Sequence, residues 1–228
     1  MITSASDDLD YAGLKRRLSS ALGPLVGVAI SNVSGDPQWL YPEEAQSVAK
    51  AVPKRQKEFA AGRKAARCAM RAIGWQDMPV PCNADRSPAW PEGLVGSISH
   101  SRQACVAIVG RKAHVKSVGI DIEDHFPIEP ELWHTICTPQ ELETVNQLDR
   151  ADRGQWVTRL FSAKEAFYKW QYPLTGRFLE FQDVAITMEN SCTSFEARCL
   201  FSNPMHTGFK RAWGRYVIEQ ALVISVVV

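Results

Sequence analysis

The 228 residues of the chain are enough for one large domain or two small ones with a hydrophobic core. The composition, 45% hydrophobic and 22% charged, is typical of globular proteins, and a net charge of +1 argues against a general binder of nucleic acids. Charged residues run through the first twenty positions, which excludes the apolar core of a signal peptide there, and the apolar stretch 21–30 is too short to span a bilayer. We therefore expect a cytoplasmic protein that binds neither nucleic acid nor membrane.

The first predicted elements are a strand and two helices. Residues 25–31 form a continuous apolar run that predicts a buried strand. A short helix over 43–51 is expected to end at Pro53, since proline cannot continue a helix. A longer helix over about 54–73 is expected to stop at Gly74. Its apolar stripe, at the spacing of 3.6 residues, consists of Phe59, Ala66, Met70 and Ile73.

A proline-rich loop over 79–91 separates this helix from the next strands. Residues 94–99 and 104–110 are rich in β-branched and small side chains, and they predict two strands joined at 100–103. Residues 117–123 predict another strand.

The rest of the chain predicts two helices followed by strands. The helices are expected at about 139–147 and 156–170, and the strands at 184–188, 194–200 and 216–228. Both halves therefore run strand, helix and paired strands, although no residue-level repeat supports the similarity.

This order of elements predicts an α+β fold of two similar lobes. Each lobe is expected to hold a small, mostly antiparallel sheet packed against a long helix. We place the N-terminal lobe at residues 1–115 and the C-terminal lobe at residues 116–228.

The six cysteines, at positions 68, 82, 105, 137, 192 and 199, include no CxxC pair. No histidine is spaced from them as a zinc ligand would be. In a chain without a signal sequence, disulfides are not expected. The sequence therefore predicts free, mostly buried thiols.

The strand around residue 121 carries two acidic residues. Side chains alternate along a strand, so Asp121 and Glu123 share one face while Ile120 and Ile122 fill the other. Neighbouring carboxylates repel, and a hard divalent cation would relieve this by taking oxygen ligands from both. The alternative is a solvated strand end with surface acids. The segment alone fits either.

The helix over 156–170 carries a second charged pair. Glu165 and Lys169 lie four residues apart, away from an apolar stripe of Trp156, Leu160, Ala163, Phe167 and Trp170. This order is also the favoured one for a simple surface ion pair, which is one interpretation. In the other, Glu165 completes a three-carboxylate Mg²⁺ site and Lys169 meets a phosphate.

A serine–histidine pair follows the strand over 94–99. Ser99 and His100 do not fit a serine hydrolase, because the GxSxG pattern would need serine where Ile98 stands. Adjacent strand residues also point to opposite faces. A histidine at a strand end can instead donate a hydrogen bond to a phosphate, or serve only as a structural residue.

Arginines recur every four residues along the helix over 54–73. Arg63 and Arg67 lie at the edge of its apolar stripe, and Arg71 continues the row. Guanidinium groups grip phosphate oxygens in pairs, although a solvated helix face is the usual reason for such a row. The segment is not a P-loop, since Gly62-Arg63-Lys64-Ala65 lacks the second glycine of that pattern.

Taken in order, these segments resemble the 4′-phosphopantetheinyl transferase superfamily. They look most like its monomeric, two-lobed branch, the enterobactin-synthetase-type subgroup associated with siderophore and nonribosomal peptide synthesis. The matching segments span about residues 55–170. They are Phe59 to Arg63 with Arg67, Arg86-Ser87-Pro88-Ala89-Trp90, Ser97 to Ser101, Val118 to Glu123, and Phe161 to Lys169.

The resemblance implies a Mg²⁺-dependent enzyme with its active site in the cleft between the two lobes. Such an enzyme moves the 4′-phosphopantetheine arm of coenzyme A onto a serine of an apo acyl, peptidyl or aryl carrier protein and releases 3′,5′-ADP. The partners implied are thus coenzyme A and carrier proteins. A diphosphate is stable, so its cleavage requires charge to be neutralised on its oxygens.

The resemblance also assigns residues. It implies Mg²⁺ ligation by Asp121, Glu123 and Glu165, and contacts with coenzyme A phosphates by Ser99, His100, Lys164 and Lys169. It places Arg63, Arg67 and Arg86 on the nucleotide end, Lys169 and Glu165 in catalysis, and Glu141 as a general base. Asp85 stands where many relatives carry glycine.

Two other classes of protein share some of these features. A Mg²⁺-dependent hydrolase of coenzyme A or of a nucleotide diphosphate would need the same metal and arginine residues but no carrier. A non-catalytic nucleotide-binding module would leave Asp121, Glu123 and Glu165 without a joint purpose. Consumption of coenzyme A that depends on a carrier and on the metal separates the three.

Overall fold

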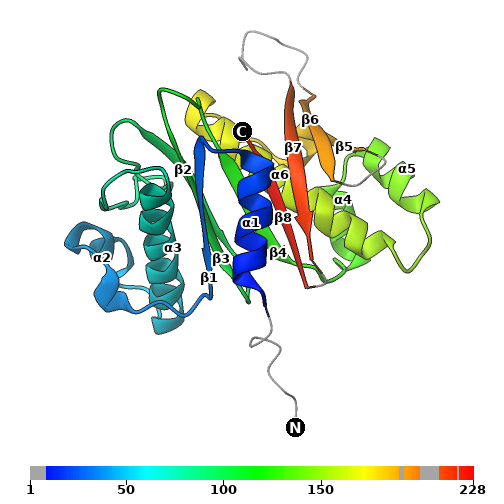
Figure 1. The fold of residues 1–228 in the computed structure, drawn as a ribbon. Helices are drawn as coiled ribbons and strands as arrows, with labels where there is room; N and C mark the ends of the chain where they lie inside the picture. Colours follow the sequence, from blue (N-terminus) through cyan, green and yellow to red (C-terminus); the bar gives the residue numbers. More distant parts are fainter. Residues whose placement is uncertain (1–8, 190–192, 201–210, 220) are drawn as a thin grey trace. The chain divides into compact units, whose positions relative to one another are not determined.

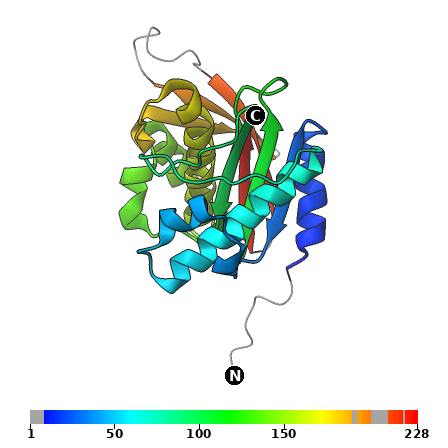
Figure 2. The ribbon, with the colours of Figure 1, turned by 90° about the vertical axis from the view of Figure 1, so that its left-hand side faces the viewer.

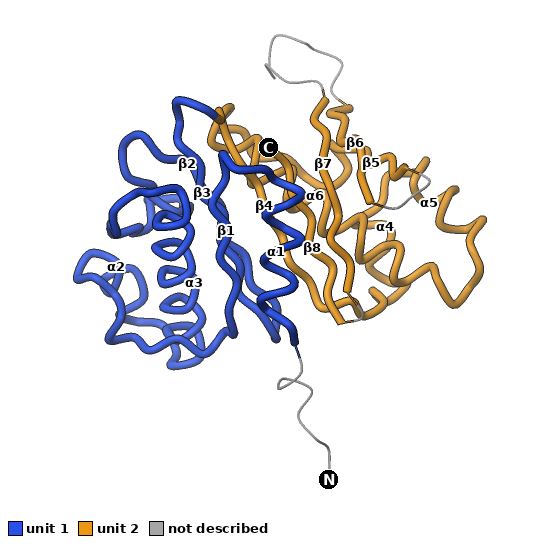
Figure 3. The backbone as a smooth tube through the Cα atoms, in the orientation of Figure 1, with its two compact units in different colours: residues 1–114 blue, residues 115–228 orange. Residues whose placement is uncertain are grey.

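The computed structural model describes residues 9–189, 193–200, 211–219 and 221–228. Within these ranges the chain forms six α-helices and two antiparallel sheets (Figure 1). The predicted α+β class is therefore confirmed. The chain divides into two compact units, residues 1–114 and residues 115–228 (Figure 3). This division lies one residue before the lobe boundary predicted from the sequence. We call them unit 1 and unit 2.

Unit 1 is a three-stranded antiparallel sheet in the order β1-β3-β2, with the long helix α3 packed across it (Figure 2). Gly27 of β1 allows this close packing, because a Cβ there would lie 2.1 Å from the carbonyl oxygen of Ala69 in α3. The elements are α1 (Tyr11–Leu22), β1 (Val26–Ser31), α2 (Pro42–Val48), α3 (Pro53–Ala72), β2 (Leu94–His100) and β3 (Cys105–Arg111), with the short helix η1 (Pro37–Trp39).

Helix α1 was not predicted from the sequence. Asp10 caps its N-terminus by accepting a hydrogen bond from the backbone N–H of Gly13. Leu14 and Leu18, four residues apart, are its only buried residues. Tyr11, Leu14, Leu18 and Leu22 recur at helical spacing between Asp10 and Gly23, so the signal for this helix is present in the sequence.

Unit 2 is a five-stranded antiparallel sheet in the order β4-β8-β7-β6-β5. The long helix α6 packs along β4 and β8 (Figure 1). The elements are β4 (Gly119–Asp124), α4 (Trp133–Ile136), α5 (Pro139–Gln147), α6 (Arg153–Thr175), β5 (Val184–Met188), β6 (Ser194–Cys199), β7 (Arg211–Ile218) and β8 (Leu222–Val227), with η2 (Pro130–Leu132) and η3 (Phe181–Asp183).

The prediction of one strand over 216–228 is wrong. The chain reverses after Ile218, and β7 and β8 pair as antiparallel neighbours, with Val217 opposite Ile224. Helix α6 also extends beyond its predicted end at Trp170 to Thr175, where Gly176 follows in the left-handed conformation with φ 64°.

Gly119 sets the distance between β4 and α6. A Cβ at this position would lie 2.0 Å from the carbonyl oxygen of Ala166 and 2.7 Å from the backbone nitrogen of Trp170. The strand and the helix therefore meet with no side chain between them at this point. The residues that alternate with it on the same face of β4, Asp121 and Glu123, are thereby held close to α6.

The five cysteines that fall in the described ranges are free, which confirms that prediction for them, and Cys192 lies outside those ranges. Cys105 and Cys137 are buried, whereas the other three are half-buried. No helix that the structure describes is both long enough and apolar enough to cross a bilayer.

Candidate active site

Two of the three acidic residues of β4, Asp121 and Glu123, face helix α6. Asp121 is buried, with 2% of its surface exposed, and Glu123 is partly buried. From α6, Lys169 donates a hydrogen bond through Nζ to Oδ1 of Asp121 over 2.6 Å. Glu165 lies one turn earlier on the same side of the helix. The structure thus brings four sequence-predicted residues into one cluster, which we call the acidic cluster.

The electrostatics of the acidic cluster show an excess of negative charge. Burial and then the neighbouring Asp121 raise the pKa of Glu123 to about 8, although Lys169 acts to lower it. Burial likewise raises the pKa of Glu165, against the lowering effect of Lys169. Three carboxylates therefore share one ammonium group, and further positive charge would stabilise them.

The donor set of the acidic cluster fits Mg²⁺ in its chemistry, since the ion prefers carboxylate oxygens. As the side chains stand, however, no group of three His, Cys, Asp or Glu residues in the described ranges is arranged to hold one ion. Lys169 occupies one of the two oxygens of Asp121. An ion bound to the cluster would therefore compete with Lys169 for this carboxylate.

A cavity of about 360 Å³ opens beside the acidic cluster in unit 2. Glu165 forms part of its wall, and most of the other side chains that line it are apolar or aromatic, among them Tyr168 and Phe178, whose rings pack edge to face. Its lining consists of Thr135, Lys164, Glu165, Tyr168, Phe178, Leu179, Glu180, Phe181, Gln182 and Val184. A cavity of this size and lining suits a slender, mostly apolar chain.

In unit 1, His100 at the end of β2 meets the start of α3. Its Nε2 lies 2.9 Å from Nη1 of Arg55 and 3.5 Å from Oε2 of Glu58. Arg55 is exposed, and it is not among the residues predicted from the sequence. The signal was present, because the four-residue spacing of Arg63 and Arg67 extends back through Phe59 to position 55. Ser99, the residue before His100, is half-buried in β2.

Arg86 lies in a tight turn with an unusual backbone. Its φ of 68° falls in the left-handed region, where it is the only described residue other than glycine. Asp85 closes the turn by accepting hydrogen bonds from the N–H and the hydroxyl of Ser87. The exposed side chain of Arg86 forms no hydrogen bond or ion pair with the residues that the structure describes. An exposed cation on a strained backbone is a candidate ligand-binding group.

Comparison with known proteins shows what this arrangement belongs to. The family model of the 4′-phosphopantetheinyl transferase N-terminal domain matches residues 43–110, and that of the 4′-phosphopantetheinyl transferase superfamily matches residues 117–226. A 4′-phosphopantetheinyl transferase of Streptomyces mobaraensis, Svp, is 36% identical over 87% of this chain and 82% of its own length. The chain belongs to the 4′-phosphopantetheinyl transferase superfamily.

Other relatives agree with this membership. The 4′-phosphopantetheinyl transferase PptT of Mycobacterium tuberculosis is 35% identical over 88% of this chain and 92% of its own length. Enterobactin synthase component D of Escherichia coli is 36% identical over 58% of this chain and 63% of its own length. The superfamily and the enzyme class predicted from the sequence are therefore confirmed.

Within this member of the phosphopantetheinyl transferase superfamily, two of the predicted arginines have internal partners. Nε of the buried Arg63 donates to the carbonyl oxygen of Val80 over 2.5 Å. Nη1 of Arg67 donates to both carboxylate oxygens of Glu44 over 2.9 Å each, and its Nη2 donates to Trp39. Both side chains join α3 to segments next to it in unit 1.

Lys164, the residue before Glu165 on α6, also forms an internal pair, with Glu141. Nζ of Lys164 donates to Glu141 and to the carbonyl oxygens of Ile136 and Phe181, over 2.7, 2.7 and 2.8 Å. These three bonds use all the protons of the ammonium group. Burial lowers the pKa of Lys164, and Glu141 opposes that effect.

Glu141 has its two oxygens occupied as well. Oε2 accepts from the backbone N–H of Thr138 over 2.7 Å besides the bond from Lys164, and Oε1 accepts from that of Ile186 over 2.7 Å. The first of these bonds belongs to the capping box that starts α5. This carboxylate therefore joins α5, α6 and β5.

Proposed function

We propose that the protein transfers the 4′-phosphopantetheine arm of coenzyme A to a serine hydroxyl of an apo carrier protein and releases 3′,5′-ADP, with Mg²⁺. Membership of the superfamily supports the reaction class. The observation that carries the proposal is the acidic cluster, three carboxylates and Lys169 on facing elements of unit 2. Such a cluster suits a divalent cation and a diphosphate.

Asp121, Glu123 and Glu165 are the proposed ligands of Mg²⁺. When bound, the ion would neutralise charge on the diphosphate oxygens. Lys169, displaced from Asp121, would then turn its ammonium group to the phosphate of the departing nucleotide. This role draws on a contact that is strongest in the transition state, so Lys169 acts on the rate more than on binding.

The cavity beside Glu165 is the proposed site of the pantetheine arm. The arm is a narrow chain of amide and methylene groups, and the cavity of about 360 Å³ offers an aromatic wall with polar groups at Thr135 and Gln182. Glu165 belongs to both the cavity and the acidic cluster, so an arm in the cavity would bring its phosphate next to the carboxylates. Lys164, whose protons are all used, contributes to the wall.

Residues of unit 1 are proposed to bind the phosphates and the nucleotide of coenzyme A. Arg86 and Arg55 carry exposed guanidinium groups, and His100 and Ser99 lie at the end of β2 next to Arg55. Guanidinium groups bind phosphate oxygens with paired hydrogen bonds. In this proposal unit 1 serves the nucleotide end and unit 2 the metal.

Arg63 and Arg67 are proposed to support the nucleotide site indirectly, without contacting the ligand. Their hydrogen bonds to Val80 and to Glu44 hold the segment that leads into the Arg86 turn, since Val80 also donates its N–H to Glu44 over 2.8 Å. The burial of Glu141 and its bonds to internal partners similarly favour a structural role over that of a general base, because a base must face the substrate.

The test is to incubate the protein with Mg²⁺, coenzyme A and apo peptidyl, aryl and acyl carrier proteins, and to measure the intact mass of each carrier. The expected result is a carrier that gains one phosphopantetheine arm, and no gain when a chelator is added. Reactions without a carrier are the control. Coenzyme A that is consumed there would identify a hydrolase, and binding without turnover under every condition would identify a nucleotide-binding module.

Compartment and assembly complete the proposal. The described cysteines are free thiols, as is usual in a reducing cytoplasm, and we propose that the protein works there as a monomer. The relationship to enterobactin synthase component D favours aryl and peptidyl carriers of siderophore and nonribosomal peptide synthesis as the first partners to test.

A further inference from the structure

Strand β8 is a buried apolar strand with one polar residue. Its six residues, Leu222-Val223-Ile224-Ser225-Val226-Val227, are all buried, and Ser225 has no exposed surface. Within the described ranges, Oγ of Ser225 forms no hydrogen bond. A buried hydroxyl without a partner is costly, because it has lost its bonds to water and gained none. Alanine or valine would fill this position at lower cost, so the hydroxyl needs another explanation.

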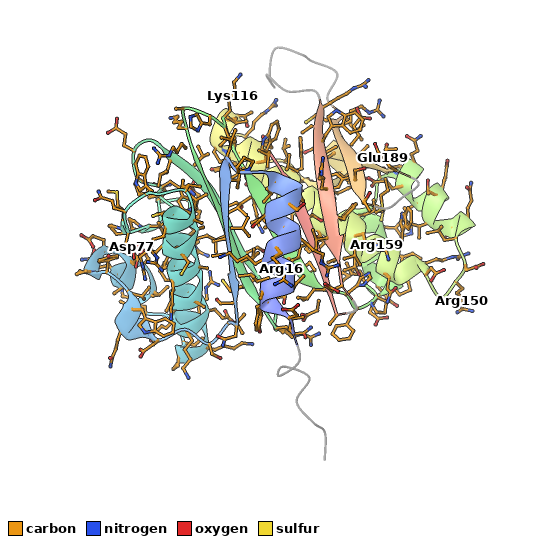
Figure 4. All side chains as sticks on the ribbon, in the orientation of Figure 1. Arg16, Asp77, Lys116, Arg150, Arg159 and Glu189 are labelled. Carbon is orange, nitrogen blue, oxygen red and sulfur yellow. The ribbon has the colours of Figure 1, made fainter. Side chains whose placement is uncertain are left out.

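The sheet register places Ser225 beside the acidic cluster. Ser225 lies directly opposite Asp121 of β4 on one side and opposite Tyr216 of β7 on the other. Residues that face each other across antiparallel strands project to the same side of the sheet, with Cβ atoms about 4.5–5.5 Å apart. The hydroxyl of Tyr216 donates to the carbonyl oxygen of Arg159, which Figure 4 labels. The side chains of Asp121 and Ser225 are therefore cross-strand neighbours on the same face of the sheet.

A second buried hydroxyl lies on the facing helix. Ser162 of α6 has no exposed surface, and its Oγ likewise forms no hydrogen bond with any described residue. It precedes Glu165 by three residues and Lys169 by seven, a spacing that puts the three side chains on one face of the helix. The acidic cluster is thus flanked by an unused hydroxyl on each of two elements that pack together, β8 and α6.

We propose that Ser225 and Ser162 are positioning residues of the metal site, with hydroxyls that bond the carboxylates of Asp121 and Glu165 once these turn toward a divalent cation. The inference rests on the proposed function, since it assumes that the acidic cluster binds Mg²⁺.

The two serine hydroxyls would donate hydrogen bonds to the carboxylates only in the metal-bound state. In the metal-free arrangement Lys169 donates to Oδ1 of Asp121, and neither serine hydroxyl has a hydrogen-bond partner among the described residues. Each carboxylate oxygen has two lone pairs, so one oxygen can ligate the ion while it or its twin accepts a hydrogen bond from serine. Such a bond fixes the direction of the carboxylate and relieves the unused hydroxyl at the same time. Metal binding therefore stabilises a polar layer that the metal-free protein leaves incomplete.

The test is Ser225→Ala, with Ser225→Thr as the variant that keeps the hydroxyl. The first readout is Mn²⁺ affinity by titration calorimetry, with no coenzyme A and no carrier present. The second is the thermal midpoint in a chelator. We expect Ser225→Ala to weaken Mn²⁺ binding by about 10-fold or more, as loss of a supporting hydrogen bond at a metal site does. Its metal-free midpoint should equal or exceed that of the wild type, and Ser225→Thr should keep affinity within about threefold, since it restores the donor.

Ser117 provides the matched control. Its buried hydroxyl also lies in unit 2, but it donates to the carbonyl oxygen of Trp170 over 2.6 Å. Ser117→Ala should therefore lower the metal-free midpoint and leave Mn²⁺ affinity unchanged. Ser162→Ala should behave like Ser225→Ala and not like Ser117→Ala.

Three outcomes would overturn the inference. Wild-type Mn²⁺ affinity in both Ser225→Ala and Ser162→Ala would show that the hydroxyls do not support the ligands, while the proposed function stands. A metal-free midpoint that falls in Ser225→Ala as it does in Ser117→Ala would show a structural role. A wild-type protein that takes up no Mn²⁺ would overturn the metal part of the proposed function together with this inference.

Discussion

Helix α6 carries two lysines in neighbouring turns, and each meets a buried carboxylate, yet the two surroundings differ. Lys164 pairs with Glu141 in a group where three protons and both carboxylate oxygens are occupied by bonds of 2.7 to 2.8 Å. Lys169 pairs with Asp121 in a group that also holds Glu123 and Glu165. The first group is neutral and complete, and the second has two carboxylates too many.

The difference shows that burial of an ion pair does not by itself indicate function. A pair whose hydrogen bonds are all internal connects elements and resists change. A group with surplus charge of one sign stabilises a ligand of the other sign. We therefore expect mutations around Lys164 to affect folding first, and mutations around Lys169 to affect activity first.

The largest effect is expected for Glu165→Gln, which keeps the shape of the side chain and removes one proposed ligand. Transfer activity should fall by about 10³-fold, since removal of one preorganised group costs up to that factor. The unfolding midpoint without metal should stay equal or rise, because the raised pKa of Glu165 means that its charge is unfavourable in the fold. Activity near that of the wild type would show that Glu165 is not a ligand of the ion.

Lys164→Met should break the complete group. The change leaves the buried Glu141 without its counter-charge, which costs about 3–5 kcal/mol of unfolding free energy in comparable pairs. Chemical denaturation measures the loss. Glu141→Gln should also destabilise the fold. If Glu141 is instead the general base, that variant keeps its stability, loses rate near neutral pH and recovers it as the pH rises.

Lys169→Met should reduce kcat by about 10²-fold, because it removes a donor that acts in the transition state. KM for coenzyme A should change little by comparison. Steady-state kinetics with a carrier protein separate the two constants. An increase in KM alone would mean that Lys169 only holds the substrate.

The surplus charge should also appear in the pH dependence of stability. The pKa of Glu123 is raised to about 8 in the metal-free fold, so the protein is most stable while this residue is protonated. Its contribution is complete below the unfolded pKa near 4.5 and is lost as the pH rises through about 8. Partial exposure keeps the loss to about 1–2 kcal/mol. Glu123→Gln should remove this slope in denaturation curves from pH 5 to 9. A wild-type slope in the variant would contradict the assignment.

In unit 1 the same contrast separates Arg67, whose partners are internal, from Arg86, which has none among the described residues. Arg86→Gly should raise the unfolding free energy by about 1 kcal/mol, because glycine adopts a positive φ without strain. The same variant should raise KM for coenzyme A. Arg67→Ala should lower stability instead. An unchanged KM in Arg86→Gly would remove Arg86 from the binding site.

Local patterns in the sequence were sufficient for much of the fold. The bounds of α5 and β5 agree with the prediction, because a proline start and a short apolar strand are signalled within the segment itself. The sequence predicts one strand where β7 and β8 form a hairpin, because the two apolar runs are separated only by a few residues around Glu219.

The contacts of the site residues could not be predicted from local sequence patterns. The row of arginines on α3 was visible, but Arg67 is 23 residues from its partner Glu44, and tertiary packing alone brings them together. Lys164 likewise meets Glu141 and Phe181 from other elements. The shared face of Asp121 and Glu123 follows from strand alternation, and their approach to Glu165 depends on how β4 lies against α6.

The distance between β4 and α6 depends on the absence of a side chain at Gly119. At Gly119 the backbone of β4 touches the backbone of α6, with a Cβ position only 2.0 Å from the carbonyl oxygen of Ala166. The distance between the carboxylates of β4 and the carboxylate of α6 is therefore determined by direct contact between the two main chains. Rotamers can adjust within that distance but cannot widen it. A single methyl group at position 119 would push β4 away from α6 and move Asp121 and Glu123 together away from Glu165. Such a variant would retain every charged group, but its carboxylates would be too far apart to bind one small ion.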